Sequence, residues 1–373
     1  MRFGKKAPGT FLAALFVPAL ASAQYAGSSY SFSSLCVNPA AATLRVAGNF
    51  TAGYQFKNSQ SEVNQSRSDS AEFPWRETVE IHKAEVFLSH VGKVFVPEAY
   101  VAYENVKKTT TVDDGLGGNQ AHANTAAFIN NMINLGIRLT DKLGFGIKYY
   151  SPVFRYKYDN TYVYSDGKTF RDASDYSGSF TGLGYGLTYK TSSKFTVGAL
   201  LISSTQSVKG ATTYTDINGQ ASSSSGVGAV NYVTKGIGIG YSSSRSRRNA
   251  WRTEVAYAVT EFPPSGLTKN GEQIFAAFEV AADVFTIGMS LRMIKNSFVD
   301  SMRLVEAFID PPPSEDKYST KIDYFLSLNS SRGHSFGADG SYWVSQGKKS
   351  FLGSEQDALT KSYSVGLSYS YFF

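Results

Sequence analysis

The side chains best suited to acid–base or metal chemistry in this chain of 373 residues are its four histidines: His82, His90, His122 and His334. They do not fall at the spacings with which protein metal sites hold an ion. His82 is the one with carboxylates close by in the sequence, at Glu80 and Glu85. Such a group would suit general acid–base hydrolysis, but we favour a structural role for it. The sequence therefore predicts no enzyme, no metal site and no cofactor.

Other chemical motifs are equally weak. Glycines at positions 182, 184 and 186 alternate with apolar residues and lack the spacing of a phosphate-binding loop. A single cysteine excludes a disulfide scaffold. The aromatic content of 14% and charged content of 18% are those of a folded chain rather than a disordered one. The formal net charge of +6 includes three cations in the first six residues, so nucleic acid is not expected as a partner.

The N-terminus has the pattern of a secretory signal. A basic start is followed by an apolar stretch over residues 11–20 and by Ala21-Ser22-Ala23. We predict that residues 1–23 are a cleaved signal peptide, so the mature protein is exported. No later stretch is long and apolar enough to predict a membrane-spanning helix.

Alternation with a period of two runs through the mature chain. In the last eleven residues the odd positions are apolar or aromatic, ending on Tyr369, Tyr371 and Phe373, while the even positions are mostly serine and glycine. Residues 183–189, 251–259 and 285–293 alternate in the same way. Each of these segments is predicted to be a strand that is apolar on one side only.

About fourteen such strands are predicted, at residues 45–57, 75–89, 93–108, 125–139, 143–158, 176–190, 194–208, 226–242, 249–262, 272–281, 284–296, 318–329, 334–347 and 360–373. Short joints, such as 140–142 and 191–193, alternate with long ones, such as 159–175 and 209–225. Short turns at one rim and longer loops at the other are typical of a transmembrane antiparallel β-barrel. An even strand count places both chain ends on the periplasmic side.

Several short motifs resemble FadL-type outer-membrane channels, which take up long-chain fatty acids and other hydrophobic compounds. Asn38-Pro39-Ala40 matches the Asn-Pro-Ala of the N-terminal hatch in that family. Residues 139–146 and 184–198 read LTDKLGFG and GYGLTYKTSSKFTVG, and are similar to its recurrent strand, turn and glycine-containing strand. The aromatic C-terminus at Tyr369, Tyr371 and Phe373 is common to most outer-membrane barrels and is expected to guide the barrel-assembly machinery.

The resemblance implies an all-β barrel of residues 45–373, in the outer membrane of a Gram-negative-type bacterium, with residues 24–44 folded inside the lumen as a hatch. The expected function is diffusion-driven uptake of hydrophobic small molecules by a monomer, with gating by the hatch. The expected partners are a fatty acid-like ligand, outer-membrane lipid and the assembly machinery. In the family, release is lateral, through a kink in the third strand. Pro97 lies in the predicted third strand, where it removes a backbone donor, so it is our candidate for that opening.

A fatty acid would bring a carboxylate into the lumen, where a cation would favour it. Four cations are predicted to face inward: Arg292, Arg252, Arg138 and Lys148. Inward acids such as Glu254, Glu279 and Asp339 would pair with them. The third and fourth outer loops, near 157–175 and 209–225, are expected to be short and polar beside the large apolar loops of FadL-type channels, which argues against an apolar capture groove there. Two alternatives remain open, namely a general porin or adhesin-like surface barrel, and an enzyme at the rim.

Overall fold

The computed structural model describes residues 38–63, 75–113, 119–163, 167–216, 218–244, 249–261, 270–295, 318–351 and 354–373. They form a single sheet of antiparallel strands preceded by one short 3-10 helix, η1 (Pro39–Leu44). The strands are β1 (Asn49–Val63), β2 (Trp75–Ser89), β3 (Phe95–Asp113), β4 (Asn119–Arg138), β5 (Leu143–Tyr150), β6 (Val153–Val163), β7 (Thr169–Lys190), β8 (Phe195–Thr215), β9 (Ala221–Ser242), β10 (Ala250–Glu261), β11 (Gly271–Ala281), β12 (Phe285–Lys295), β13 (Ser319–Asn329), β14 (His334–Phe351) and β15 (Ser354–Phe372). The predicted signal peptide lies outside the described residues.

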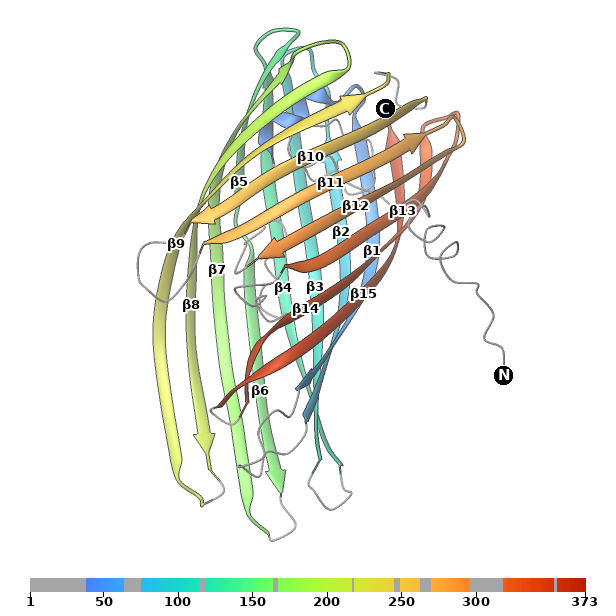
Figure 1. Cartoon of the computed structure of the whole chain (residues 1–373). Coiled ribbons are helices and arrows are strands. Elements are labelled where there is room, and N and C mark those ends of the chain that lie inside the picture. The colour runs from blue at the N-terminus through green and yellow to red at the C-terminus, as the bar shows by residue number, and fades with distance from the viewer. Residues whose placement is uncertain are drawn as a thin grey trace, which may run out of the picture.

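The sheet closes into a barrel (Figure 1). Strand β1 pairs with β15 along its whole length, and β3 pairs with β4 to complete the ring. Closure leaves every strand with a neighbour on each side, which a sheet needs where no water can bond to its backbone. The predicted all-β closed barrel is confirmed.

The described residues form fifteen strands, whereas the sequence predicts about fourteen. The predicted strand 143–158 is split into β5 and β6, and both pair with β4 on one side and β7 on the other. The break falls at Ser151 and Pro152. The amide of Phe180 donates to the carbonyl of Pro152, at 2.9 Å, but proline has no N–H to return to Phe180. The two strands therefore share one position in the ring and one register.

The outward face carries an apolar belt. On β7 the outward residues Leu183, Tyr185, Leu187 and Tyr189 are 40–48% exposed, while the residues between them face the lumen. The outward residues of β15 follow the same rule. Exposed apolar side chains all round a closed barrel must face lipid, so this chain is a membrane-spanning β-barrel. No described helix is long and apolar enough to cross a membrane.

The two ends of the barrel differ. At the end we call the short-turn rim, connections run over residues 90–94, 139–142, 191–194, 282–284 and 330–333, and the C-terminus lies there too. Phe373 and Gly48 exchange two backbone hydrogen bonds at this rim, at 2.8 and 3.1 Å. Tyr369 and Tyr371 precede Phe373 on the outward face of β15.

At the other end, the strands on one side of the barrel continue far past the belt (Figure 1). Strands β7 and β9 have 22 residues each, whereas β10 to β13 have only 11 or 12. We call the long part the outer extension: residues 104–113 of β3, 119–130 of β4, 153–163 of β6, 169–180 of β7, 203–215 of β8 and 221–232 of β9.

The outer extension corrects the predicted loops. Most of 108–124, 159–175 and 209–225 is strand, not loop. Hydrogen bonding continues across these hairpins because their threonine, valine and tyrosine residues favour extended backbone, and only a few residues remain at each tip. The sequence also predicts an apolar, proline-rich outer loop at 304–316, and these residues lie outside the described ranges.

Candidate functional site

A short stretch of chain lies inside the barrel at the short-turn rim. We call Asn38–Arg45 the lumen segment; it contains η1, and all of its residues are buried. Asn38 caps the helix by accepting from the amide of Ala40, at 3.0 Å, and its side chain donates to the carbonyl of Leu187 on β7, at 3.1 Å. Proline at the first helical position fits this start, because its missing N–H would have no partner there.

Four glycines lie in the wall beneath the lumen segment. A Cβ on Gly146 would lie 2.2 Å from the carbonyl carbon of Pro39, and one on Gly186 would lie 2.0 Å from the side-chain oxygen of Asn38. Gly144 and Gly136 face Thr43 and Ala42 in the same way. The alternating glycines of the sequence therefore let this segment rest directly on the backbone of β4, β5 and β7.

Charged and amide side chains hold the segment from above and below. Arg45 forms a buried ion pair with Glu98 on β3. Glu98 also accepts from Asn134, at 2.7 Å, and Asn134 donates to the carbonyl of Pro39, at 3.2 Å. Arg138 donates to the carbonyls of Thr43, at 3.0 Å, and Arg45, at 2.5 Å. The segment is thus bound to three strands by hydrogen bonds and an ion pair.

Arg138 thus points inward, as predicted, but its donors are directed to main-chain carbonyls. Lys148 is also inward and completely buried, opposite Asn134 and Gly184 in the sheet register. Neither residue stands alone in an open lumen. Their predicted role as ligands for a carboxylate stays a prediction.

Two further predicted cations, Arg252 and Arg292, face inward and are 5% and 2% exposed. Arg252 forms an ion pair with Glu279 on the neighbouring strand. The side chain of Arg292 lies 3.2 Å from a carboxylate oxygen of Asp323. The predicted pairing of inward cations with acids is therefore present, and a solute carboxylate would have to compete with it.

The lumen has two unlike sides. Most of the buried apolar cluster lies on β2 to β8, and we call this part the apolar lumen wall: Val79, Ile81, Phe87, Tyr100, Val106, Phe128, Met132, Tyr150, Phe154, Phe180, Leu200 and Ile202. The cluster continues onto β10 and β11 with Ala256, Ala258 and Phe275. The opposite side, the hydroxyl face, belongs to β13, β14, β15 and β1: Ser319, Ser327, Ser335, Ser341, Ser345, Thr360, Ser362, Ser364, Ser370, Thr51, Ser59 and Ser61. Such a lumen offers an apolar surface to a solute on one side and hydroxyl groups on the other.

Aromatic rings continue the apolar lumen wall into the outer extension. The rings of Phe128, Phe154 and Phe180 follow one another across β4, β6 and β7, with centroids 5.7 and 6.0 Å apart. These separations are those of interacting aromatic pairs. They give the lumen a continuous aromatic surface at the level where the belt ends.

A second row of rings lies nearer the strand tips. The centroid distances are 4.4 Å from His122 to Tyr162, 5.5 Å from Tyr162 to Phe170 and 4.9 Å from Phe170 to Tyr214. Burial lowers the pKa of His122 below its usual value, which keeps the imidazole neutral at neutral pH. All four rings can therefore act as uncharged surface.

The residues predicted for alternative chemistry do not assemble. His82 and Glu80 are on the outward face of β2, where the ring of His82 bonds to the hydroxyl of Tyr54, while Glu85 faces the lumen. The wall thus separates the proposed base from one of its acids. No group of three or more His, Cys, Asp or Glu residues in the described ranges is placed to hold a metal ion.

Pro97, the candidate for the lateral opening, lies beside the turn that precedes β3. It is the third residue of β3 and pairs with Leu135 of β4, while its carbonyl accepts from His90 in the turn before β3, at 3.0 Å. In an antiparallel strand the N and C=O of one residue face the same neighbour, so the missing donor lies at the turn. From Glu98 onward the pairing of β3 is continuous on both sides, and a lateral opening at Pro97 stays a prediction.

Comparison with solved structures identifies the architecture. The toluene transporter TodX of Pseudomonas putida matches at a TM-score of 0.63, with 10% identity, over 94% of this chain and 96% of its own. TbuX, a toluene transporter of Ralstonia pickettii, matches at 0.59, with 10% identity, over 95% and 97%. A Pseudomonas aeruginosa FadL homologue matches at 0.59, with 13% identity, over 90% and 92%. This chain has their fold.

The resemblance to FadL-type channels is thus confirmed at the level of the fold. No protein-family model matches the sequence. No curated protein matches it either. At such low identities the likeness concerns architecture, and the solute has to be argued from this chain's own lumen.

The aromatic rows are the part of the site that sequence reasoning missed. A signal was present in residues 153–163, where the even positions are mainly aromatic and the odd positions are charged at Arg155, Lys157 and Asp159. In residues 143–149, which precede this stretch in the same part of the wall, the outward odd positions are apolar: Leu143, Phe145, Ile147 and Tyr149. Charge on that face marks the point where a strand leaves the membrane, and it shows that aromatic residues beyond that point face inward.

Proposed function

We propose that this chain is an outer-membrane channel for the diffusion-driven uptake of hydrophobic small molecules. The observation that carries the proposal is the apolar lumen wall, which runs from the aromatic rows of the outer extension down one side of the barrel. The fold supports it, since the neighbours named above are a toluene transporter from each of two species and a FadL homologue.

Uncharged solutes fit this lumen better than carboxylates. Arg252 and Arg292 are paired with acids, and Arg138 is occupied by main-chain carbonyls. Aromatic rings stack favourably on aromatic walls, so a monoaromatic hydrocarbon is the preferred class. Long-chain fatty acids remain a candidate, with the acyl chain on the apolar lumen wall and the carboxylate held by Arg292.

The lumen segment is the proposed gate. It lies inside the short-turn rim, against β3, β4, β5 and β7. In this proposal that rim faces the periplasm, and a solute leaving through it would have to displace the segment. Residues 24–37 would complete the hatch. Lateral release at Pro97 would require the pairing of β3 to open, and it remains a secondary prediction.

The decisive experiment is uptake of labelled toluene and of labelled fatty acid by cells that lack their own transporter. We expect wild type to accelerate toluene uptake more than fatty acid uptake, and deletion of Asn38–Ala40 to change the rate. Unchanged uptake in the deletion would remove the gating role. The competing function, a general porin or adhesin-like barrel, requires an open lumen, and large steady conductance of the wild type in planar bilayers would favour it.

A further inference from the structure

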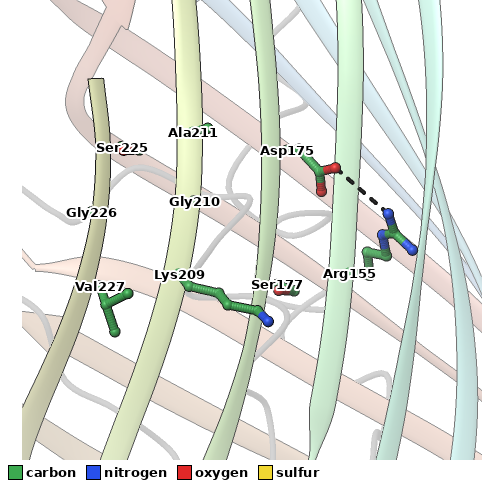
Figure 2. A pocket seen from close by; sticks show the side chains of 9 residues that line it. All are labelled: Arg155, Asp175, Ser177, Lys209, Gly210, Ala211, Ser225, Gly226 and Val227. Carbon is green, nitrogen blue, oxygen red and sulfur yellow. Dashed lines mark ion pairs between the residues drawn. The ribbon is translucent and has the colours of Figure 1, made fainter. Parts of the chain in front are cut away.

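A shallow groove crosses the outward face of the outer extension, on strands β6, β7, β8 and β9 (Figure 2). Its lining contains two cations, one carboxylate, two serines and an exposed valine: Arg155, Lys209, Asp175, Ser177, Ser225 and Val227. The outward residues of the neighbouring belt are apolar, whereas those of the groove are mostly charged or polar. The groove therefore does not face the hydrocarbon layer but suits a polar or charged partner.

The sheet register brings the two cations into one row. Arg155 lies opposite Ser177, Ser177 opposite Lys209, and Lys209 opposite Val227. Neighbouring strands are about 4.8 Å apart, so the Cα atoms of Arg155 and Lys209 are about 10 Å apart. Figure 2 shows the side chain of Lys209 lying toward Ser177, with Arg155 on the far side of it. Side chains of this length can reach a single anion placed between them, above the hydroxyl of Ser177.

The cations are not neutralised by the protein around them. The side chain of Arg155 is 71% exposed and touches Asp175 through one long contact of 3.6 Å. Among the described residues, no hydrogen bond or ion pair holds Lys209. Asp159, the next acid on β6, is bound by Arg171 through two hydrogen bonds, of 2.8 and 2.5 Å. Lys157, exposed on the same face, adds a third cation.

The height of the row suits a lipid headgroup. Arg155 is twelve residues beyond Leu143, the first residue of β5 at the short-turn rim, in the same register. At about 3.3 Å per residue and a tilt of about 40°, it lies about 30 Å above that rim. The apolar band of such barrels is about 25 Å tall. The row therefore sits just above the hydrocarbon, where lipid phosphates are found.

We infer that this groove binds the phosphorylated headgroup of an outer-leaflet glycolipid, with the phosphate between Arg155 and Lys209. The inference rests on the proposed function, because it takes the outer extension to face the outside of the cell. Val227 is 85% exposed beside the row and offers an apolar contact to the lipid body. Each cation near an anionic lipid surface is expected to contribute about fivefold in affinity.

The test measures lipid binding to the purified full-length barrel in detergent. A bisphosphorylated glycolipid, lipid A, is titrated and the bound species are counted by native mass spectrometry. We expect the double variant Arg155→Ser, Lys209→Ser to bind about 25-fold more weakly than wild type. Lys361→Ser is the matched control, because Lys361 is an exposed outward lysine near the outer end of β15, on another part of the wall, and its binding should be unchanged.

Two further arms decide between sources of the anion. Lipid A stripped of its phosphates should bind wild type and double variant equally weakly, and millimolar inorganic phosphate should not displace intact lipid A. Equal binding of intact lipid A by wild type and double variant would overturn the inference, as would displacement by phosphate alone. Folding of each variant is checked by its heat-dependent gel mobility. Solute uptake is measured separately, so normal lipid binding without uptake would count against the channel function only.

Discussion

Replacing Gly146 by alanine should unseat the lumen segment. The added Cβ would lie 2.2, 2.3 and 2.4 Å from main-chain atoms of Pro39 and Ala40, where ordinary contact begins at 3.4 Å. Relief requires a shift of about 1 Å. Such a shift carries two hydrogen bonds beyond the usual limit of about 3.5 Å: the 3.2 Å bond from Asn134 to Pro39 and the 3.1 Å bond from Asn38 to Leu187.

The size of the effect follows from those two bonds. At about 1 kcal/mol net for each, the seated state loses about 2 kcal/mol, or about 30-fold in the ratio of seated to unseated segment. The free energy of unfolding of the barrel should stay the same. The alanine methyl group replaces a Cα hydrogen of Gly146, which takes no part in the backbone hydrogen bonds of β4, β5 and β7. Gly146→Ala therefore tests how the lumen segment is held in place, not whether the barrel folds.

Under the gating role proposed above, single-channel recording in planar bilayers measures this ratio as open probability. We expect brief, rare openings in wild type and openings about 30-fold more frequent in Gly146→Ala. Gly226→Ala is the matched control, because a Cβ there meets nothing within 4 Å. If Gly146→Ala and Gly226→Ala both conduct like wild type while the deletion of Asn38–Ala40 opens the pore, the steric reasoning about Gly146 is wrong.

Three more outcomes are expected. Phe180→Ala should lower toluene uptake several-fold by removing the middle of an aromatic row, whereas Ser362→Ala on the hydroxyl face should leave uptake unchanged; equal rates in the two would disprove the preference for one side of the lumen. Arg252→Leu should destabilise the barrel by about 3–5 kcal/mol, because it leaves Glu279 buried without its ion-pair partner, and adding Glu279→Leu should restore most of the loss; the midpoint of heat-dependent gel mobility reports both, and no recovery in the double variant would contradict this account. Because burial lowers the pKa of His122, the unfolded chain binds the extra proton, so stability falls as the pH drops below the usual value of 6.5; His122→Phe should make the unfolding midpoint less sensitive between about pH 7.5 and pH 5, and an unaltered pH profile would exclude this ring as the cause.

The alternation with a period of two was sufficient to predict the barrel. Successive side chains in the belt point in turn to lipid and to the lumen, so the sequence alternates between apolar and small or polar residues. It predicted that Arg252 and Arg292 face inward, and it placed most strand ends at the short-turn rim within a few residues. The turns at this rim are short and mostly polar, so the alternation of apolar residues ends where the strand ends.

The same pattern failed beyond the membrane. Water on the outer side of the hairpins removes the need for apolar residues, so alternation fades while hydrogen bonding continues. Polar runs such as Ser222 to Ser225 then look like loop in the sequence although they belong to β9. The split at Pro152 was missed for a different reason, since a proline is visible in the sequence but its effect depends on which neighbour its nitrogen faces.

The position of the lumen segment could be predicted from the sequence only in part. Asn38-Pro39 is a helix start that local rules recognise. Its contacts with Gly146 and Gly186 join residues more than a hundred positions apart, and no local pattern reports such a distance. The hydrogen bonds from Arg138 to carbonyls of the lumen segment depend on the same placement of that segment. The alternation pattern shows only that Arg138 faces inward, so it could not predict these partners.

The split between β5 and β6 has a consequence for how the wall moves. The carbonyl of Phe180 receives no ladder donor from Pro152, and Tyr150, Phe154 and Phe180 surround that position. A cylinder of continuous ladders is stiff, but one missing bond lets the adjoining amides open locally and exchange hydrogen sooner than their neighbours. This weakened point of the wall then coincides with buried aromatic rings, which under the proposed function would have to move when a solute passes.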